Sequence, residues 1–161
     1  MKVPYSLFLI VSGLTACTNS NNNSVLTDHP DTLAGTKTEV IETLCFEQSE
    51  GTSNRDTSYA QMVINGQKIT GVLATFPYEK DSRVGTIFGT KEGDLIKAVW
   101  IYMQEGIPDT LDVEFKLDKD QLLQKSFSVD TKTGRQFLSD SNSFSTEFHK
   151  IDCNKLPQRL H

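Results

Sequence analysis

Three histidines, three cysteines and several carboxylates are the residues of this 161-residue chain that could do chemistry. A Ser-His-Asp hydrolase needs a histidine on a rigid element beside its nucleophile, and the sequence has no Gly-x-Ser-x-Gly motif. His29 lies in a polar stretch, His161 stands at the end of the given sequence, and His149 falls in a strand-like run. We therefore predict a protein that is not an enzyme.

Two further motifs could bind a ligand, but their residues fit a structural role better. Asp118 and Asp120 flank Lys119 in "LDKDQ", but a calcium loop needs more ligands and a glycine at fixed spacing. Gly85 and Gly89 in "VGTIFGTK" lack the Lys-Ser/Thr of a phosphate loop. In a strand such glycines mark bulges or sharp bends. We predict a turn, a bent strand, no metal and no cofactor.

Cys17 lies where an apolar run gives way to a polar one. A basic start and about a dozen apolar residues, ending at Ala16, have the length of a secretory signal and are too short to span a bilayer. The tetrapeptide "LTAC" resembles the lipobox of bacterial lipoproteins. This resemblance implies cleavage after residue 16, a diacylglyceryl group on the Cys17 thiol and acylation of the new amino group. The alternative is an ordinary signal peptide with an incidental cysteine.

The stretch after Cys17 predicts a tether and a location. Residues 17–38 are rich in Asn, Ser and Thr, a composition typical of a flexible segment, and several acyl chains give stable membrane attachment. No acidic run follows Cys17, which favours an outer-membrane lipoprotein of the cell envelope that faces the periplasm. The formal net charge of −5 and the lack of a Lys/Arg cluster argue against a nucleic-acid partner.

Cys45 and Cys153 remain once Cys17 carries lipid. In an exported protein, two such cysteines most simply form one disulfide. A two-cysteine metal site is the alternative, although only His149 lies near in sequence and no Cys-x-x-Cys occurs. The pair would join the start of the first strand to the end of the last. In a meander these points meet if an even number of strands closes into a barrel.

Strand and turn patterns fill the chain from residue 40 onwards. Asn65-Gly66 separates two β-rich runs and predicts a hairpin, and residues 111–117 alternate between apolar and charged side chains. The eight expected strands are 40–49, 56–64, 67–76, 83–91, 95–104, 110–118, 122–129 and 144–153. Gln136–Leu138 is a candidate ninth strand, which would spoil the even count unless it lies outside the main sheet.

The count predicts an all-β fold, an eight-stranded antiparallel up-and-down barrel of the lipocalin-like (calycin) type. The barrel domain would span residues 39–153 and be followed by a tail, 154–161. A β-sandwich is the alternative architecture.

Aromatic residues supply a candidate ligand site inside this barrel. Trp100 and Tyr102 share one face of their strand with Ile96 and Ala98, although the opposite face is apolar too. An apolar, aromatic barrel mouth is a common ligand site, and the same residues would also serve as plain core. The candidate ligand-binding set is Trp100, Tyr102, Phe88, Phe76 and Met62.

The region from Cys45 to Cys153 is similar to a group of small bacterial lipoproteins with a lipocalin-like barrel. The similarity rests on Cys45-Phe46, on the "GTIFGT…GDLIKAVWIYMQEG" block at 85–106 and on the closing cysteine. It implies the barrel fold and no particular reaction. We predict a lipid-anchored, non-catalytic binding barrel for a small apolar or amphipathic ligand. The alternative is a solid barrel that acts through its surface on an envelope protein, as a hydrolase inhibitor or an assembly accessory.

Overall fold

The computed structural model describes residues 40–160. The predicted signal peptide (1–16), Cys17, the tether up to residue 38, His29 and His161 lie outside the described residues. The strands are β1 Ile41–Glu50, β2 Asp56–Asn65, β3 Lys68–Phe76, β4 Arg83–Glu92, β5 Leu95–Gln104, β6 Ile107–Leu117, β7 Gln121–Lys125, β8 Ser128–Val129, β9 Gln136–Phe137 and β10 Phe144–Ile151. Three 3-10 helices are η1 Thr52–Asn54, η2 Cys153–Lys155 and η3 Gln158–Leu160. Within residues 40–160, no helix has the length and hydropathy of a membrane span.

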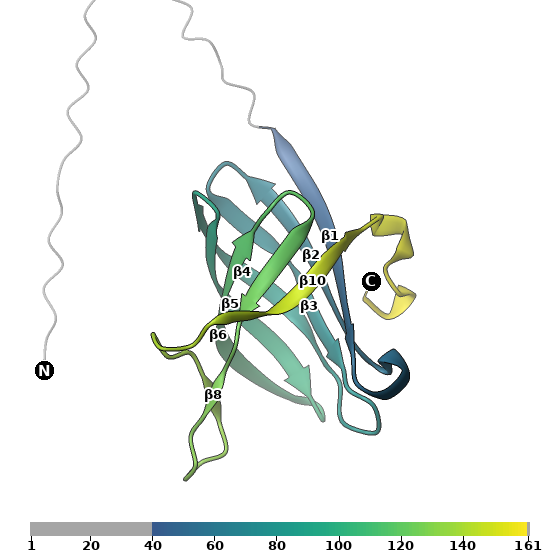
Figure 1. Ribbon diagram of the computed structural model, residues 1–161, viewed down its shortest axis with the longest axis vertical. Helices are drawn as coiled ribbons and strands as arrows, with labels where there is room; N and C mark the ends of the chain where they lie inside the picture. The colour runs from purple at the N-terminus through teal and green to yellow at the C-terminus, as the bar shows by residue number, and fades with distance from the viewer. Residues whose placement is uncertain (1–39, 161) are drawn as a thin grey trace, which may run out of the picture. The chain divides into compact units, whose positions relative to one another are not determined.

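Eight of the strands close into a barrel in which every neighbouring pair is antiparallel (Figure 1). Each strand pairs with the next along the chain, and β10 closes the ring between β7 and β1. The predicted eight-stranded up-and-down barrel is therefore confirmed, and the sandwich alternative is wrong. Gln136–Phe137 does form an extra strand, β9, but it pairs with β8 in a separate two-stranded sheet. The expected strand 122–129 is accordingly split between the barrel and this small sheet.

The predicted disulfide joins Cys45 to Cys153, whose Cα atoms are 5.1 Å apart. Cys45 lies opposite Ile151 in the β1–β10 ladder, so the first and last barrel strands meet as expected. Because Leu44 and Phe46 belong to the core, strand alternation places Cys45 on the outer face of the barrel. The bond therefore fixes the segment after β10 to the outside of β1.

The β2–β3 hairpin forms as predicted, but its turn is displaced by one residue. Asn65 is the last residue of β2 and pairs with Lys68, which leaves Gly66 and Gln67 as the central residues. Gly66 has a φ of 59°, a conformation that glycine adopts without steric cost. Glycine at the first central position suits a two-residue hairpin loop.

Inward-facing glycines let neighbouring strands approach closely inside the barrel. A Cβ atom on Gly85 would overlap the carbonyl oxygen of Ile101 and the Cα of Tyr102 on β5. The β4–β5 register runs without interruption past Gly85 and Gly89. These glycines therefore serve close strand packing and mark no bulge in this ladder.

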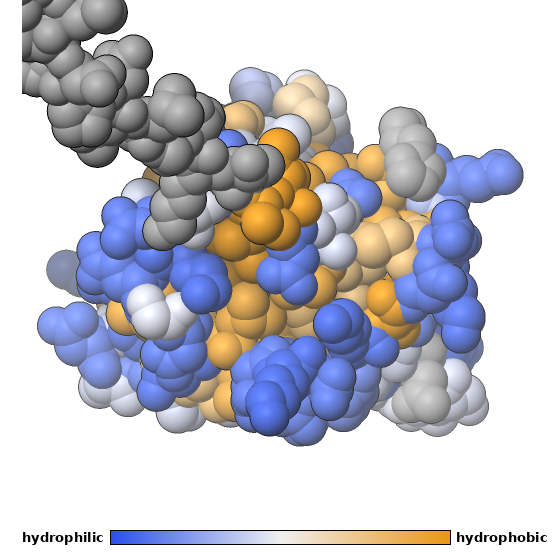
Figure 2. Space-filling view, turned by 90° about the horizontal axis from the view of Figure 1, so that it is seen from above, coloured by the Kyte–Doolittle hydropathy of each residue, from blue (hydrophilic) through white to orange (hydrophobic). Residues whose placement is uncertain are grey.

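The two ends of the barrel are built differently. At the end where β1 begins, the connections are the short stretches 66–67, 93–94 and 118–120. Figure 2 views this end and shows apolar residues at its centre among hydrophilic ones. At the opposite end lie η1, the 77–82 loop, the 105–106 turn and residues 126–143, which carry β8 and β9 (Figure 1). We call the first the packed end, the second the mouth, and residues 126–143 the arm.

Candidate functional site: a polar cavity at the barrel mouth

Inward-facing side chains change from apolar to polar as the strands approach the mouth. Along each strand every second residue faces the interior, so one strand contributes both to the core and to the space beyond it. On three strands a glutamine follows the last inward core residue. The pairs are Phe46 and Gln48 on β1, Tyr102 and Gln104 on β5, and Leu122 and Gln124 on β7. The core thus ends partway along the barrel.

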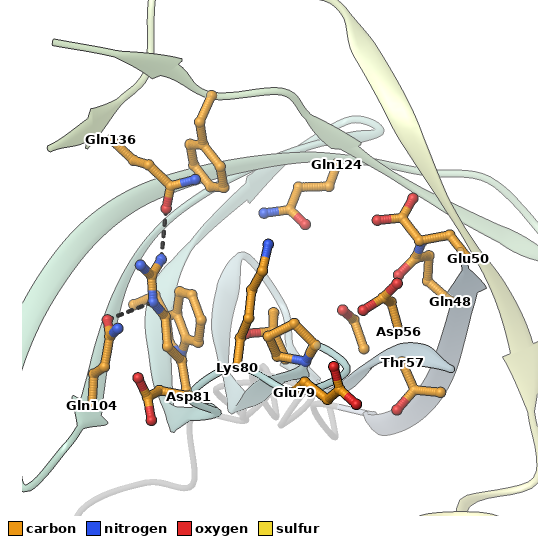
Figure 3. Close-up of a pocket in the computed structure, with 16 residues that line it drawn as sticks. Gln48, Glu50, Asp56, Thr57, Glu79, Lys80, Asp81, Gln104, Gln124 and Gln136 are labelled. Atoms are coloured by element: carbon orange, nitrogen blue, oxygen red, sulfur yellow. Dashed lines mark hydrogen bonds between the residues drawn. The ribbon is translucent and has the colours of Figure 1, made fainter. Parts of the chain in front are cut away.

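A cavity of about 700 Å³ occupies the mouth (Figure 3). Four glutamines, four carboxylates and two cationic side chains line it, together with Trp100, Phe127 and a few smaller residues. Its volume lies in the range of small-molecule sites, which is about 300–1,000 Å³. The cavity is therefore large enough for a ligand, and its wall is mainly polar.

Two of the glutamines are buried without a protein partner. Gln48 is 7% and Gln124 8% exposed, yet neither side-chain amide makes a hydrogen bond within residues 40–160. Both line the cavity, and Figure 3 shows the Gln124 amide directed into it. Their amide atoms face the cavity space, because Asn65 Oδ1 is the one side-chain atom within residues 40–160 that is both fully enclosed and unpartnered. These amides are thus available to groups that enter the cavity.

Arg83, at the start of β4, is held in the cavity wall by neutral groups. Its Nε donates to Gln104 Oε1 at 2.8 Å, and Nη1 donates to Gln136 Oε1 at 2.6 Å (Figure 3). The guanidinium carbon lies 5.2 Å from the centre of the Tyr102 ring, a favourable cation–π arrangement. No ion pair within residues 40–160 includes Arg83. Its position is fixed and its charge is uncompensated.

The carboxylates of the cavity lie towards its rim. Glu50 and Glu79 are exposed, and Asp56 Oδ1 accepts a 2.6 Å hydrogen bond from the Tyr78 backbone N–H. In Figure 3 these three carboxylates lie on the side of the cavity away from Gln104, whereas Asp81 lies beside Gln104. Three of the four lining carboxylates are therefore grouped on one side of the cavity.

A fourth rim carboxylate forms a like-charge pair. Asp81, which lines the cavity, makes a side-chain hydrogen bond with Glu105 in the β5–β6 turn, and this bond raises the pKa of Glu105. Two carboxylates can share such a bond only when one carries a proton. Glu105 therefore takes up its proton at a higher pH than a free glutamate does.

The arm forms one wall of the mouth and is tied to the barrel by polar contacts. Arg135 Nη2 donates to Asp109 Oδ1 on β6 at 2.7 Å, and Gln136 contacts Arg83 as described above. The hydrogen bond from the Thr110 N–H and then the one from Arg135 lower the pKa of Asp109. Asp109 also lies 3.4 Å from the Tyr102 hydroxyl, whose pKa is raised chiefly by burial. The arm is therefore held to the barrel by an ion pair and hydrogen bonds, whereas its β8–β9 pairing lies within the arm itself.

The structure brings three of the five predicted ligand residues together. Met62, Trp100 and Tyr102 face the interior and belong to one core cluster. Trp100 and Tyr102 have ring centres 4.4 Å apart, and the Trp100 Nε1 donates to the Leu73 carbonyl at 3.0 Å. Only Trp100 of this group lines the mouth cavity. Met62, Trp100 and Tyr102 therefore serve mainly as core residues.

The other two predicted ligand residues lie outside the barrel, so their placement was wrong. Phe88 is 49% exposed, because its neighbour Ile87 takes the inward position on β4. Phe76 is buried, but under the C-terminal tail, with the Arg159 guanidinium 3.4 Å from its ring centre. The predicted apolar mouth is wrong as well, since apolar side chains fill the core and polar ones line the open space.

The other residues considered for chemistry are placed away from the mouth cavity. His149 is exposed on β10, with Nδ1 3.6 Å from Glu147 Oε1. Asp118 begins the turn at the packed end, where its Oδ1 accepts from the Lys119 N–H at 2.7 Å. Neither His149 nor Asp118 lines the mouth cavity. The turn predicted for "DKDQ" is confirmed.

Sequence reasoning missed the polar residues of the cavity, although a signal for them exists. Once Phe46 and Trp100 are assigned to the interior, counting in steps of two reaches Gln48 and Gln104. Arg83 is harder to find, because the next inward position of its strand is Gly85, which has no side chain to mark the inward face. Extending the alternation of inward and outward residues to the ends of the strands would have identified most of the residues that line the cavity.

Comparison of the chain with protein-family models, with curated proteins and with solved structures gives no match.

Proposed function

We propose that this chain is a lipid-anchored, non-catalytic binding protein whose ligand site is the mouth cavity. The observation that carries the proposal is the pair Gln48 and Gln124, buried and unpartnered beside about 700 Å³ of open space. A polar lining selects a polar or amphipathic ligand, because an apolar molecule would leave these amides without hydrogen bonds. The exposed position of His149 outside the cavity supports a non-catalytic role.

The proposed anchor suits this site. Lipid on Cys17 would attach the chain to the outer membrane, facing the periplasm, where a disulfide such as Cys45–Cys153 persists. The described chain begins at Val40 at the packed end (Figure 1). β1 rises about 30 Å from there to the mouth, at roughly 3.3 Å per residue. A ligand would therefore enter at the end of the barrel opposite the tether's attachment point.

Native mass spectrometry of protein purified from its own cells tests the binding role. We expect a mass above that of the polypeptide under native conditions and the polypeptide mass after denaturation. A chain that always carries only its own mass, with or without added cell extract, contradicts the proposal. For the anchor, Cys17→Ser should move the protein from the membrane fraction to the soluble fraction.

A second function, as a protein-interaction module, has one observation in its favour. Phe88, Val99, Ile101 and Met103 form an exposed apolar stripe on the outer face of β4 and β5, and Phe88 pairs directly with Val99. Exposed apolar patches on small proteins often mark protein contacts. A photo-crosslinking residue at position 101 should then give one defined product that the same residue at position 67 does not give. Identical patterns at both positions would exclude this function.

A further inference from the structure

We propose that the mouth cavity receives its ligand through a carboxylate group, which binds the Arg83 guanidinium. The amides of Gln48 and Gln124 then bind hydroxyl or amide groups beside that carboxylate. This inference rests on the proposed function, because it names the ligand class of the same site.

Arg83 has the features of a prepared anion receptor. Two amide oxygens and one aromatic ring hold its guanidinium, and all three are neutral. Its Nη2 group makes no hydrogen bond within residues 40–160. A guanidinium offers parallel N–H donors that match the two oxygens of a carboxylate. The unused donors are therefore suited to that group.

Lys80 adds a second positive charge to the lining of the cavity. Its ammonium group points into the cavity in Figure 3, towards the level of Gln124. No ion pair within residues 40–160 includes Lys80. Arg83 and Lys80 are the two cationic side chains of the lining, which also includes four carboxylates.

The buried amides define the rest of the ligand. A glutamine amide both donates and accepts, so Gln48 and Gln124 together offer donors and acceptors to neutral polar groups. Neither carries a charge, and both lie deeper than the exposed carboxylates of Glu50 and Glu79. A carboxylate that reaches Arg83 would lie beside these two neutral amides. The arrangement favours an acid on a hydroxyl- or amide-bearing scaffold.

Trp100 provides a direct readout of binding. It is the one tryptophan of the 161-residue sequence, and it lines the cavity. We would titrate the purified protein with two matched pairs while recording tryptophan fluorescence. The pairs are D-glucuronate with D-glucose, and N-acetylglycylglycine with its C-terminal amide. The members of each pair differ chiefly in the carboxylate.

We expect at least one acid to bind about tenfold more tightly than its neutral partner, the size of one lost charged hydrogen bond. Arg83→Gln should remove that preference, and Arg159→Gln, on the outer face, should retain it. Equal binding of acid and neutral partner, or an unchanged preference in Arg83→Gln, overturns the inference and leaves the cavity as a binding site. Binding of none of the four probes at millimolar concentration also overturns it, and the bound mass in native spectrometry then decides the proposed function separately.

Discussion

The packed half and the mouth half of this barrel share strands and topology but differ in what faces inward. In the packed half, inward residues such as Phe46, Phe115 and Leu122 are fully buried against one another. In the mouth half, the same strands present Gln48 and Gln124 to a cavity. The closed sheet therefore fixes the shape of both halves. Side-chain chemistry alone decides which half is core and which is open.

This difference separates stability from binding within one small barrel. An eight-stranded barrel is just wide enough for side chains to fill its interior or to hold one small ligand, and this protein does each in a different half. Changes in the packed half should alter the free energy of unfolding. Changes in the mouth half should alter ligand binding.

The strongest test of the packed half is Phe115→Ala. Phe115 is fully buried in the core cluster, and truncation of a buried Phe usually costs about 3–5 kcal/mol. Urea unfolding followed by circular dichroism measures the loss. The exposed Phe88→Ala is the matched control and should change the free energy by less than about 1 kcal/mol, within the usual range for surface positions. Similar losses in both variants would contradict the assignment of the core.

Reduction of the disulfide should have the next largest effect. Cys45 and Cys153 lie 108 residues apart, and loss of a native disulfide in a small exported domain costs about 2–5 kcal/mol. We expect Cys45→Ser/Cys153→Ser to unfold at lower urea concentration than the wild type, whereas added reductant should leave the double variant unchanged. A wild type whose unfolding midpoint does not respond to reductant would show that the bond adds no stability.

Gly85→Ala should destabilise the barrel where its two halves meet. The added Cβ would overlap backbone atoms of Ile101 and Tyr102, and such overpacking costs about 1–3 kcal/mol. Gly93 has open space around it but a φ of 62°, so Gly93→Asn is a milder control that keeps the turn geometry. Equal stability of Gly85→Ala and wild type would show that the strands separate more easily than their close approach suggests.

Acid should loosen the arm without unfolding the barrel. The pKa of Asp130 is lowered by the N–H groups of Thr133 and Lys132, and that of Asp109 by Thr110 and Arg135. Lowered values mean that the stability these carboxylates add is complete above their ordinary pKa of 3.8 and is lost as pH falls through the lowered values. The heteronuclear NOE of Thr133 should drop at acid pH while that of Trp100 stays high. Asp109→Asn should weaken the arm at neutral pH, and an arm equally rigid at both pH values would exclude this tethering.

The fold could be predicted from the sequence because alternation, turn residues and cysteine placement agree. The Cys45–Cys153 pair brings the first and last strands together, which in a meander requires an even number of strands and a closed ring, and both are present. The Asn65-Gly66 turn was displaced by one residue, because the choice between two-residue turns depends on strand register. Register is set by the neighbouring strands and is not encoded in the turn itself.

The site could be predicted only in part, for reasons that also concern register. Phe88 and Phe76 were placed inside because they are aromatic, yet Ile87 and Leu73 hold the inward positions on β4 and β3. Gln136 comes to Arg83 from the arm, 53 residues further along the chain. No local pattern indicates such a contact. The alternation of inward and outward residues along a strand can be predicted from one sequence. The way a long connection folds over the mouth cannot.

The double variant Gln48→Leu/Gln124→Leu tests the division of the barrel most directly. Leucine is similar in size to glutamine, and neither glutamine side chain makes a hydrogen bond within residues 40–160 that the change would remove. We therefore predict a free energy of unfolding close to that of the wild type. The same variant should lose the mass that the wild type carries in native spectrometry, while Gln67→Leu at the packed end retains it. A loss of stability as large as that of Phe115→Ala, or an unchanged bound mass, would contradict the account.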